Sequence, residues 1–288
     1  MMQNINTKLT DEELNSFIQL LTDRTGIIPH ATHKEGIKNY IEASLLEKNI
    51  NAEEYKNLII SNPQNFSEFI NESTVNETYF FREEKQFILL RDKIFKTYKN
   101  KSSGKSINMW SAACSYGEEA YSLALLALSC GITPNVIASD INSEVLEHCA
   151  NGVFLGTSLR PMDGNSFHNL VLPYKREDRK IEFNSEIKEH IKTIFVNLSE
   201  LDSPSYKPNL PKNQDIIFLR NVFIYFNQEL RSRILKTIAE ECLSDDGYLF
   251  VSVSEVAQLD YPVIPSSLEK ISDGNIFYFH KKGGKANG

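Results

Sequence analysis

The spacing of apolar residues near the start of the chain is typical of short amphipathic helices. Residues 9–26 carry apolar side chains at helical spacing, with Thr10 as a candidate N-terminal cap and Gly26 as a terminator. Residues 33–49 and 51–62 follow the same period. The pattern predicts a small all-helical N-terminal domain.

From about residue 106 the pattern changes to apolar strands that alternate with helices. The expected strands are residues 107–113, 135–140, 214–220, 247–255 and 275–280, and the expected helices are residues 118–131, 141–154 and 227–243. Such alternation implies a parallel sheet with right-handed crossovers, so the fold class is α/β.

Between residues 157 and 195 this alternation lapses into polar, turn-rich sequence. The segments 179–184 and 190–198 inside it predict a small antiparallel β insertion. The predicted layout is a helical domain at 1–75, a linker and the first helix of the second domain at 76–105, the sheet domain at 106–282 with its insertion at 157–195, and a flexible tail at 283–288.

Composition narrows the class of protein. The net charge of −7 disfavours a generic nucleic-acid binder, which needs basic residues to neutralise phosphates. No run of about 18 apolar residues and no apolar secretory core are present, so we expect a cytoplasmic protein without membrane insertion. The four cysteines form no CxxC pair, and His30 and His33 have no third ligand nearby, so no metal is expected.

The loop at residues 111–119 follows the first expected strand and combines small residues, one glycine and two glutamates. Small residues let backbone amides approach a ligand closely. The loop lacks G-x-G-x-x-G, and Glu118 and Glu119 would repel a pyrophosphate but suit a cationic amino group. This favours S-adenosylmethionine over NAD, while a plain turn whose glutamates suit the helix dipole remains the alternative.

Asp140 ends the second expected strand, where an acidic residue binds ribose hydroxyls in nucleoside-binding α/β folds. An acid at this position fits adenosine. The alternative is that Asp140 caps the following helix, and the two roles are compatible.

Five ordered motifs resemble the CheR family of chemotaxis receptor methyltransferases. They are NETYFFRE at 76–83, WSAACSYGEEAYSLAL at 110–125, ASDINSEVL at 138–146, FVNL at 195–198 and FLRNVFIYF at 218–226. The resemblance spans about residues 10–280. It implies a helical N-terminal domain joined to a Rossmann-like domain with a small β insertion, and methyl transfer from S-adenosylmethionine to glutamate carboxylates on the cytoplasmic helices of a chemoreceptor, which gives glutamate methyl esters.

The resemblance also implies the site residues. The predicted cofactor-binding residues are Asn76, Thr78, Arg82, Glu118, Glu119, Asp140, Asn197, Leu198, Arg220 and Asn221, and the predicted catalytic residues are Arg82 and Tyr225. Which of the two glutamates faces the cofactor stays open. Without the resemblance, Tyr225 would be a packed tyrosine and Arg220 the partner of a nearby acid.

The expected reaction needs no general base, because a glutamate carboxylate is already ionised at neutral pH. Catalysis should therefore be mostly alignment and electrostatics, with Arg82 and Tyr225 orienting the groups. The alternatives are a methyltransferase for another protein or a small molecule, and a non-catalytic module that binds the cofactor and signals.

Partner choice is where the chain departs from the family. Receptor-binding members carry several arginines on the second N-terminal helix, whereas residues 34–45 contain none. Because charge complementarity sets partner choice, the receptor is expected to be divergent. Whether the insertion binds a tethering peptide by adding a strand stays open. A monomer is expected.

Overall fold

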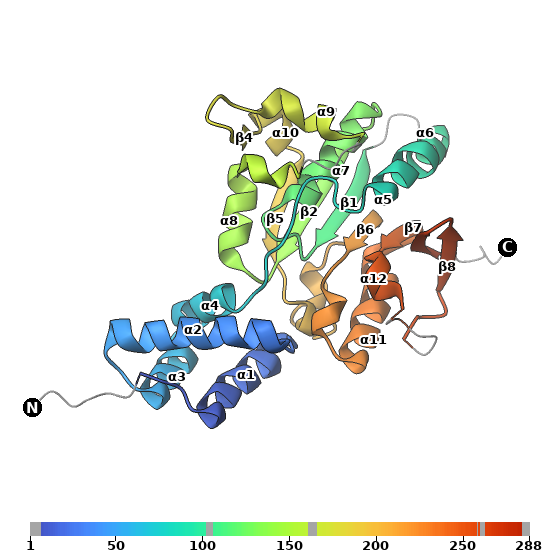
Figure 1. Cartoon of the computed structure of the whole chain (residues 1–288). Coiled ribbons are helices and arrows are strands. Elements are labelled where there is room, and N and C mark those ends of the chain that lie inside the picture. Colours follow the sequence, from blue (N-terminus) through green and yellow to red (C-terminus); the bar gives the residue numbers. More distant parts are fainter. Residues whose placement is uncertain (1–6, 102–105, 161–165, 258, 260–262, 284–288) are drawn as a thin grey trace, which may run out of the picture.

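The computed structural model describes residues 7–101, 106–160, 166–257, 259 and 263–283. These parts of the chain form a small helical unit beside a larger α/β unit (Figure 1). Among them, no helix is both long and apolar enough to cross a bilayer. The predicted tail lies outside the described residues, apart from Gly283.

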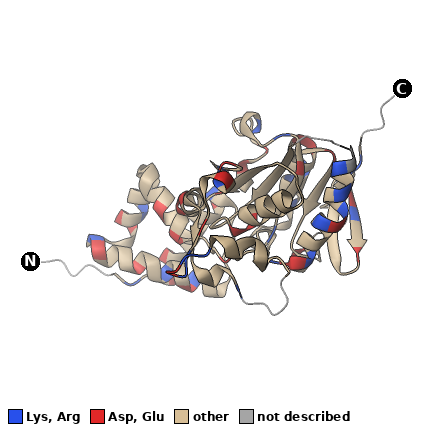
Figure 2. Ribbon diagram, turned by 90° about the horizontal axis from the view of Figure 1, so that it is seen from above, with Lys and Arg blue, Asp and Glu red and all other residues tan. Residues whose placement is uncertain are grey.

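The first unit is all-helical, as predicted. Its helices are α1 (Asp11–Thr25), α2 (Ala31–Lys48), α3 (Ala52–Ser61) and α4 (Pro63–Glu72). The predicted cap is confirmed: Thr10 Oγ1 accepts a bond from the Glu13 N–H, and the Glu13 carboxylate accepts one from the Thr10 N–H. Gly26 ends α1 at φ 73°, a conformation that glycine adopts at little cost. Both signs of charge occur along these helices (Figure 2).

The second unit is built on one seven-stranded sheet in the order β5-β2-β1-β6-β7-β9-β8. Its strands are β1 (Ile107–Ala112), β2 (Pro134–Asp140), β5 (Ile191–Phe195), β6 (Gln214–Leu219), β7 (Leu243–Phe250), β8 (Leu268–Asp273) and β9 (Ile276–Lys281). Only β9 runs against the others. The order reverses between β1 and β6, so the loops after these two strands diverge at one edge and leave room for a ligand.

Helices cover both faces of the sheet (Figure 1). The longer elements are α5 (Glu84–Leu89), α6 (Phe95–Lys101), α7 (Glu118–Ser129), α8 (Ser143–Asn151) and α11 (Gln228–Thr237), with π-helical turns η1 (Leu90–Ile94) and η7 (Ile238–Cys242). The short elements are α9 (His168–Val171), α10 (Ser185–Lys188), α12 (Val253–Val256) and the 3₁₀ turns η2 (Gly156–Ser158), η3 (Leu172–Tyr174), η4 (Leu198–Glu200), η5 (Lys207–Asn209) and η6 (Phe223–Tyr225).

The predicted β insertion is smaller than expected and excludes one predicted strand. Its antiparallel pair joins β3 (Val153–Phe154) to β4 (Ile181–Glu182). The expectation that residues 190–198 belong to it was wrong, because Ile191–Phe195 pairs in parallel with β2 as an edge strand of the main sheet. The half-exposed pattern of an edge strand cannot be distinguished by sequence from an antiparallel strand.

Other elements also differ from the predictions. The helix expected over 141–154 ends at Asn151, because Gly152 at φ 66° terminates it before β3. The strand expected over 247–255 ends at Phe250 and a short helix, α12, follows. Strand β8 was not predicted, since its outward-facing positions are polar.

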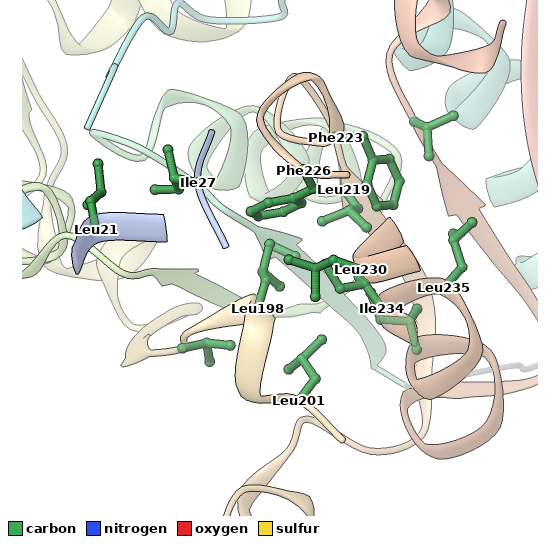
Figure 3. Close-up of a cluster of buried hydrophobic side chains, with 14 of the residues drawn as sticks. Leu21, Ile27, Leu198, Leu201, Leu219, Phe223, Phe226, Leu230, Ile234 and Leu235 are labelled. Carbon is green, nitrogen blue, oxygen red and sulfur yellow. The ribbon is translucent and has the colours of Figure 1, made fainter. Parts of the chain in front are cut away.

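Side chains of the central strands alternate between two buried clusters, one on each face of the sheet. In β1, Met109 packs into one cluster and Trp110 into the other, so the strand is buried on both sides as parallel strands usually are. Helix α1 contributes to the cluster that contains Trp110, where Leu21 packs with residues of the α/β unit (Figure 3). A Cβ on Gly26 would lie 2.2 Å from Leu230 Cδ2, so this approach requires glycine. The two units therefore share one core.

Candidate active site

A cavity opens where the chain leaves the carboxyl ends of β1, β2, β5 and β6. Its lining combines apolar side chains with a few convergent polar and charged groups, as is usual for cofactor sites. Every predicted site residue except Glu118 lines it: Asn76, Thr78, Arg82, Glu119, Asp140, Asn197, Leu198, Arg220, Asn221 and Tyr225. Residues far apart in the sequence thus meet at one place, while their individual roles stay predictions.

The loop after β1 forms a floor of small residues. Ala113 and Ser115 have φ values of 62° and 52°, and Gly117 has φ 105°. A Cβ on Gly117 would lie 2.4 Å from Cys149 Sγ, which explains the glycine at this turn. The loop therefore holds its backbone close to the cavity without large side chains in the way.

The structure distinguishes the two glutamates. Glu119 lines the cavity, where its carboxylate accepts bonds from Ser111 Oγ at 2.5 Å and from Arg220 Nε at 2.8 Å. Glu118 points elsewhere: it is 3% exposed, Oε1 accepts a bond from Ser158 Oγ, and Oε2 has no hydrogen-bond partner among the described residues. Glu119 is therefore the residue placed to meet a cationic group, and the geometry gives Glu118 no part in the cavity.

Glu118 should make folding stability depend on pH. Burial raises the pKa of its carboxyl, opposed by the Ser158 hydrogen bond. The folded chain therefore holds this proton more tightly than the unfolded chain, and its stabilising contribution falls as pH rises from about 4.3 through the raised value. We expect Glu118→Gln to gain stability relative to wild type between about pH 4 and about pH 8, measured by urea unfolding. A difference that does not change with pH would contradict this.

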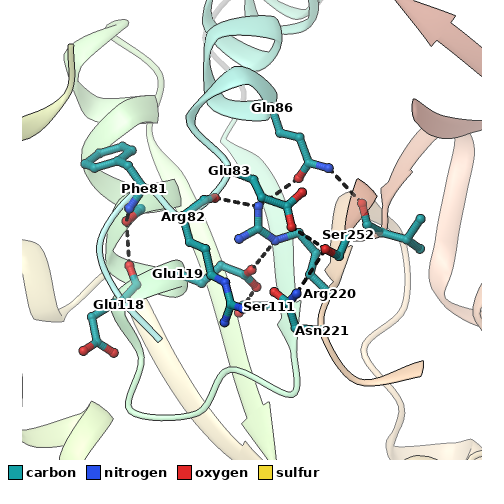
Figure 4. A network of polar contacts seen from close by, with 12 residues as sticks. Phe81, Arg82, Glu83, Gln86, Ser111, Glu118, Glu119, Arg220, Asn221 and Ser252 are labelled. Atoms are coloured by element: carbon teal, nitrogen blue, oxygen red, sulfur yellow. Dashed lines mark hydrogen bonds and ion pairs between the residues drawn. The ribbon is translucent and has the colours of Figure 1, made fainter. Parts of the chain in front are cut away.

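Arg220 is the centre of a buried polar network (Figure 4). Besides its ion pair with Glu119, Nη1 donates to the Arg82 carbonyl at 2.8 Å and to Gln86 Oε1 at 2.9 Å. Gln86, which is fully buried, donates in turn to the Val251 carbonyl at 2.8 Å. The expectation that Arg220 could pair with a nearby acid is confirmed, and its guanidinium joins the Arg82 turn, α7 and the end of β7.

Asn221 belongs to a second network after β6. Its N–H donates to Glu255 Oε2 at 2.8 Å, and its side chain donates to Ser252 Oγ at 3.0 Å. Glu255 is fully buried, and burial raises the pKa of its carboxyl. Gln86, Ser252 and Glu255 were not predicted from the sequence, because single buried polar residues carry no motif of their own.

Asp140 is nearly buried and accepts two backbone bonds, from the Ser115 N–H at 2.9 Å and from the Asn142 N–H at 3.0 Å. Burial raises the pKa of its carboxyl, and these bonds oppose the shift. Asn142, not Asp140, caps α8, so the capping alternative for Asp140 was wrong. Its place at the cavity wall leaves Asp140 suited to hydroxyl donors.

Removing the Asp140 carboxylate should weaken cofactor binding. We expect Asp140→Ala to raise the Kd for S-adenosylhomocysteine by about 10- to 100-fold, because bonds to a charged acceptor are lost. Calorimetric titration checks this. Asp215→Ala is the matched control, because Asp215 also accepts a backbone N–H, from Asn108 at 2.9 Å, but lies outside the cavity lining. Unchanged affinity in Asp140→Ala would contradict the ribose assignment.

Asn197 and Leu198 line the cavity after β5. The Asn197 side chain accepts a bond from the Ser199 N–H at 3.1 Å and donates to the Arg24 carbonyl at 2.8 Å, so it ties η4 to the end of α1. Leu198 is nearly buried. At this edge of the cavity Asn197 is therefore anchored by its own hydrogen bonds, and Leu198 adds an apolar surface of the kind that a planar base packs against.

The linker and the N-terminal unit close the cavity. Asn76 Nδ2 donates to Thr74 Oγ1 at 3.1 Å, and Arg82 Nη1 donates to the Glu77 carbonyl at 2.6 Å. The N-terminal unit adds Thr25, Ile27 and His33 to the lining, which the sequence analysis did not anticipate.

Tyr225 lies where the two units meet. Its ring centroid is 6.1 Å from those of both His30 and His33, and His33 Nε2 lies 2.7 Å from the Ser73 carbonyl oxygen. Burial raises the pKa of the Tyr225 phenol, with Arg82 opposing. The phenol is therefore a hydrogen-bond donor at neutral pH. In the described part of the chain, no three His, Cys, Asp or Glu side chains gather so as to hold a metal.

Strand order and site chemistry together define a class. The sheet reverses order at the cavity, one acid there suits ribose, a second suits an ammonium group, and the loop after β1 lacks a dinucleotide-binding pattern. These features are those of a Rossmann-like methyltransferase that uses S-adenosylmethionine.

Comparison with known proteins gives the family. Residues 76–265 match the CheR methyltransferase, SAM binding domain. A chemotaxis protein methyltransferase of Borreliella burgdorferi is 29% identical over 285 residues, 93% of this chain and 97% of the relative. That of Escherichia coli is 32% identical over 254 residues, 86% of this chain and 85% of the relative. The chain belongs to the CheR family of methyltransferases, and its cofactor is S-adenosylmethionine.

The residues present fit this cofactor. Glu119 offers a carboxylate for its ammonium group, Asp140 an acceptor for its ribose, and Arg82 a cation for its carboxylate. The three charges line one cavity, with Glu119 in the first turn of α7, Asp140 at the end of β2 and Arg82 on the linker. This complements a ligand that carries both charges of an amino acid.

Proposed function

We propose that this protein methylates glutamate side chains on the cytoplasmic helices of a chemoreceptor and therefore works in the cytoplasm. The observation that carries the proposal is the meeting of Arg82 and Tyr225 in the cofactor cavity, beneath residues of the N-terminal helices. A cation and a protonated phenol favour an anionic nucleophile, and a glutamate carboxylate is anionic at neutral pH.

The roles assigned to the side chains follow from this chemistry. S-adenosylmethionine supplies the methyl group as an electrophile when bound. Glu119 and Asp140 hold the cofactor, Arg82 binds its carboxylate beside the reaction centre, and the Tyr225 hydroxyl donates a hydrogen bond that orients the substrate carboxylate. No side chain needs to remove a proton, so catalysis depends on alignment in a partly closed cavity.

The N-terminal helices are the proposed docking surface for the receptor. Helix α2 exposes Glu35 and Glu47 beside Lys34, Lys38 and Lys48, and it has no arginine. A surface that carries both signs of charge selects its partner by the arrangement of its charges rather than by net attraction. The receptor partner should therefore differ in its surface charges from those of arginine-rich family members.

A labelled-methyl assay tests the proposed function. The protein is incubated with methyl-labelled S-adenosylmethionine and cytoplasmic receptor fragments from the same organism. We expect label on the receptor that mild base releases, because carboxyl methyl esters hydrolyse readily whereas N-methyl groups do not. Cofactor binding without transfer to any receptor fragment would overturn the proposal and favour a different substrate or a non-catalytic module.

A further inference from the structure

The backbone on both sides of Arg82 is left-handed. Phe81 has φ 55° and Glu83 has φ 60°. A residue with a side chain rarely adopts this conformation, because its Cβ crowds the backbone, and the conformation persists only where the surroundings enforce it. Two such residues flanking one cavity-lining arginine indicate that its direction is held from both sides.

Core packing holds the backbone at Phe81, on one side of Arg82. The Phe81 N–H donates to Ser122 Oγ at 2.9 Å, and the ring stacks on Phe167 with centroids 4.9 Å apart. The Phe87 ring meets the Phe81 ring edge-on, with centroids 5.1 Å apart. Phe81 is 1% exposed, so this residue is immobilised by its apolar neighbours.

Polar contacts hold the backbone at Glu83, on the other side of Arg82. The Glu83 carboxylate accepts a bond from Ser252 Oγ and another from the Val253 N–H at 3.2 Å, both just after β7 (Figure 4). The Glu83 carbonyl accepts a bond from the Gln86 N–H at 2.9 Å. Ser252 also accepts the Asn221 bond, so Glu83 links the Arg82 turn to the network after β6.

We propose that Glu83 is a positioning residue that holds the Arg82 guanidinium where it receives the methionine carboxylate of S-adenosylmethionine. Glu83 is not among the residues that line the cavity, so it acts through Arg82 and not by touching the cofactor. Without the bonds to the Glu83 carboxylate, the backbone at residue 83 relaxes toward ordinary angles. The Arg82 side chain then turns away from the position of the cofactor carboxylate. The inference rests on the role proposed for Arg82.

Two ligands separate positioning from general damage. S-adenosylhomocysteine carries the amino-acid carboxylate, whereas methylthioadenosine lacks the whole amino-acid part. We expect Glu83→Ala to bind S-adenosylhomocysteine about tenfold more weakly than wild type, which is the effect of one lost bond to a charged group. It should bind methylthioadenosine like wild type. Glu83→Gln keeps one acceptor oxygen, so its affinity for S-adenosylhomocysteine should lie between those of wild type and Glu83→Ala. In an Arg82→Ala background, Glu83→Ala should add nothing.

Glu84→Ala is the matched control. This neighbouring glutamate accepts bonds from Ser166 N and Oγ, both at 2.6 Å, and within the described part of the chain its carboxylate bonds neither to the end of β7 nor to Arg82. It should bind both ligands like wild type. Equal loss of both ligands in the two Glu83 variants, or wild-type binding of S-adenosylhomocysteine by both, would overturn the inference. If Arg82→Ala itself binds both ligands like wild type, the assigned role of Arg82 fails instead.

Discussion

Replacing Arg82 with alanine is expected to lower kcat/KM for methyl transfer by about 10²–10³-fold, as loss of one oriented charged donor typically does. The Arg82 guanidinium lines the cavity beside Tyr225 and is fixed by the Glu77 carbonyl at 2.6 Å. Its loss would remove both the contact that we propose with the cofactor carboxylate and a cation near the proposed reaction centre. Steady-state kinetics on receptor fragments measures the effect.

Two variants give this result its meaning. Arg82→Lys should recover only part of the activity, because an ammonium group cannot form the paired bonds of a guanidinium. Arg160→Ala should retain activity, although Arg160 also stacks over Tyr79, 4.6 Å from the ring centroid, and pairs with Glu77 at 2.7 Å. Arg160 is not one of the cavity-lining residues. Activity of Arg82→Ala close to that of wild type would contradict the site assignment.

Replacing Arg220 with methionine is expected to lower the free energy of unfolding by about 3–5 kcal/mol, because it leaves the Glu119 carboxylate buried without its cation. The Arg220 side chain is 2% exposed and that of Glu119 is 11% exposed. The variant also loses the bonds to Gln86 and to the Arg82 carbonyl. Urea unfolding of the protein without cofactor measures the change.

Arg233→Met is the control for this loss. Arg233 makes two bonds to Asp202, at 2.8 and 2.7 Å, but the two side chains are 46% and 37% exposed. Its replacement should therefore cost less than about 1 kcal/mol, as usual for a surface pair. Similar losses in the two variants would contradict the view that the Arg220 pair is a buried structural element.

Much of the fold was predictable because its signals are local. The cap at Thr10, the end of α1 at Gly26 and the strands β1, β2 and β6 follow from residue types at fixed spacing. The edge strands were not predictable in the same way. Residues 191–195 join the main sheet through contacts with β2 that no local pattern encodes, and β8 is polar on its outer face.

The site was predictable where a motif carried it. Ten of the eleven predicted residues line the cavity, and Glu118 is the exception, because neighbouring residues on α7 point in different directions and sequence could not tell Glu118 from Glu119. The residues that support the site were missed. Gln86, Ser252 and Glu255 act through buried bonds between distant segments, which only the folded chain brings together.

Mass-spectrometric mapping of the methylated product tests the central claim most directly. A receptor cytoplasmic fragment is incubated with the protein and S-adenosylmethionine, digested under mildly acidic conditions and sequenced. The account predicts one methyl group on glutamate side chains of the helical cytoplasmic region, absent when Arg82→Ala replaces the wild-type protein. Methyl groups on lysine or arginine nitrogens, or on a small molecule with the receptor unmodified, would contradict it.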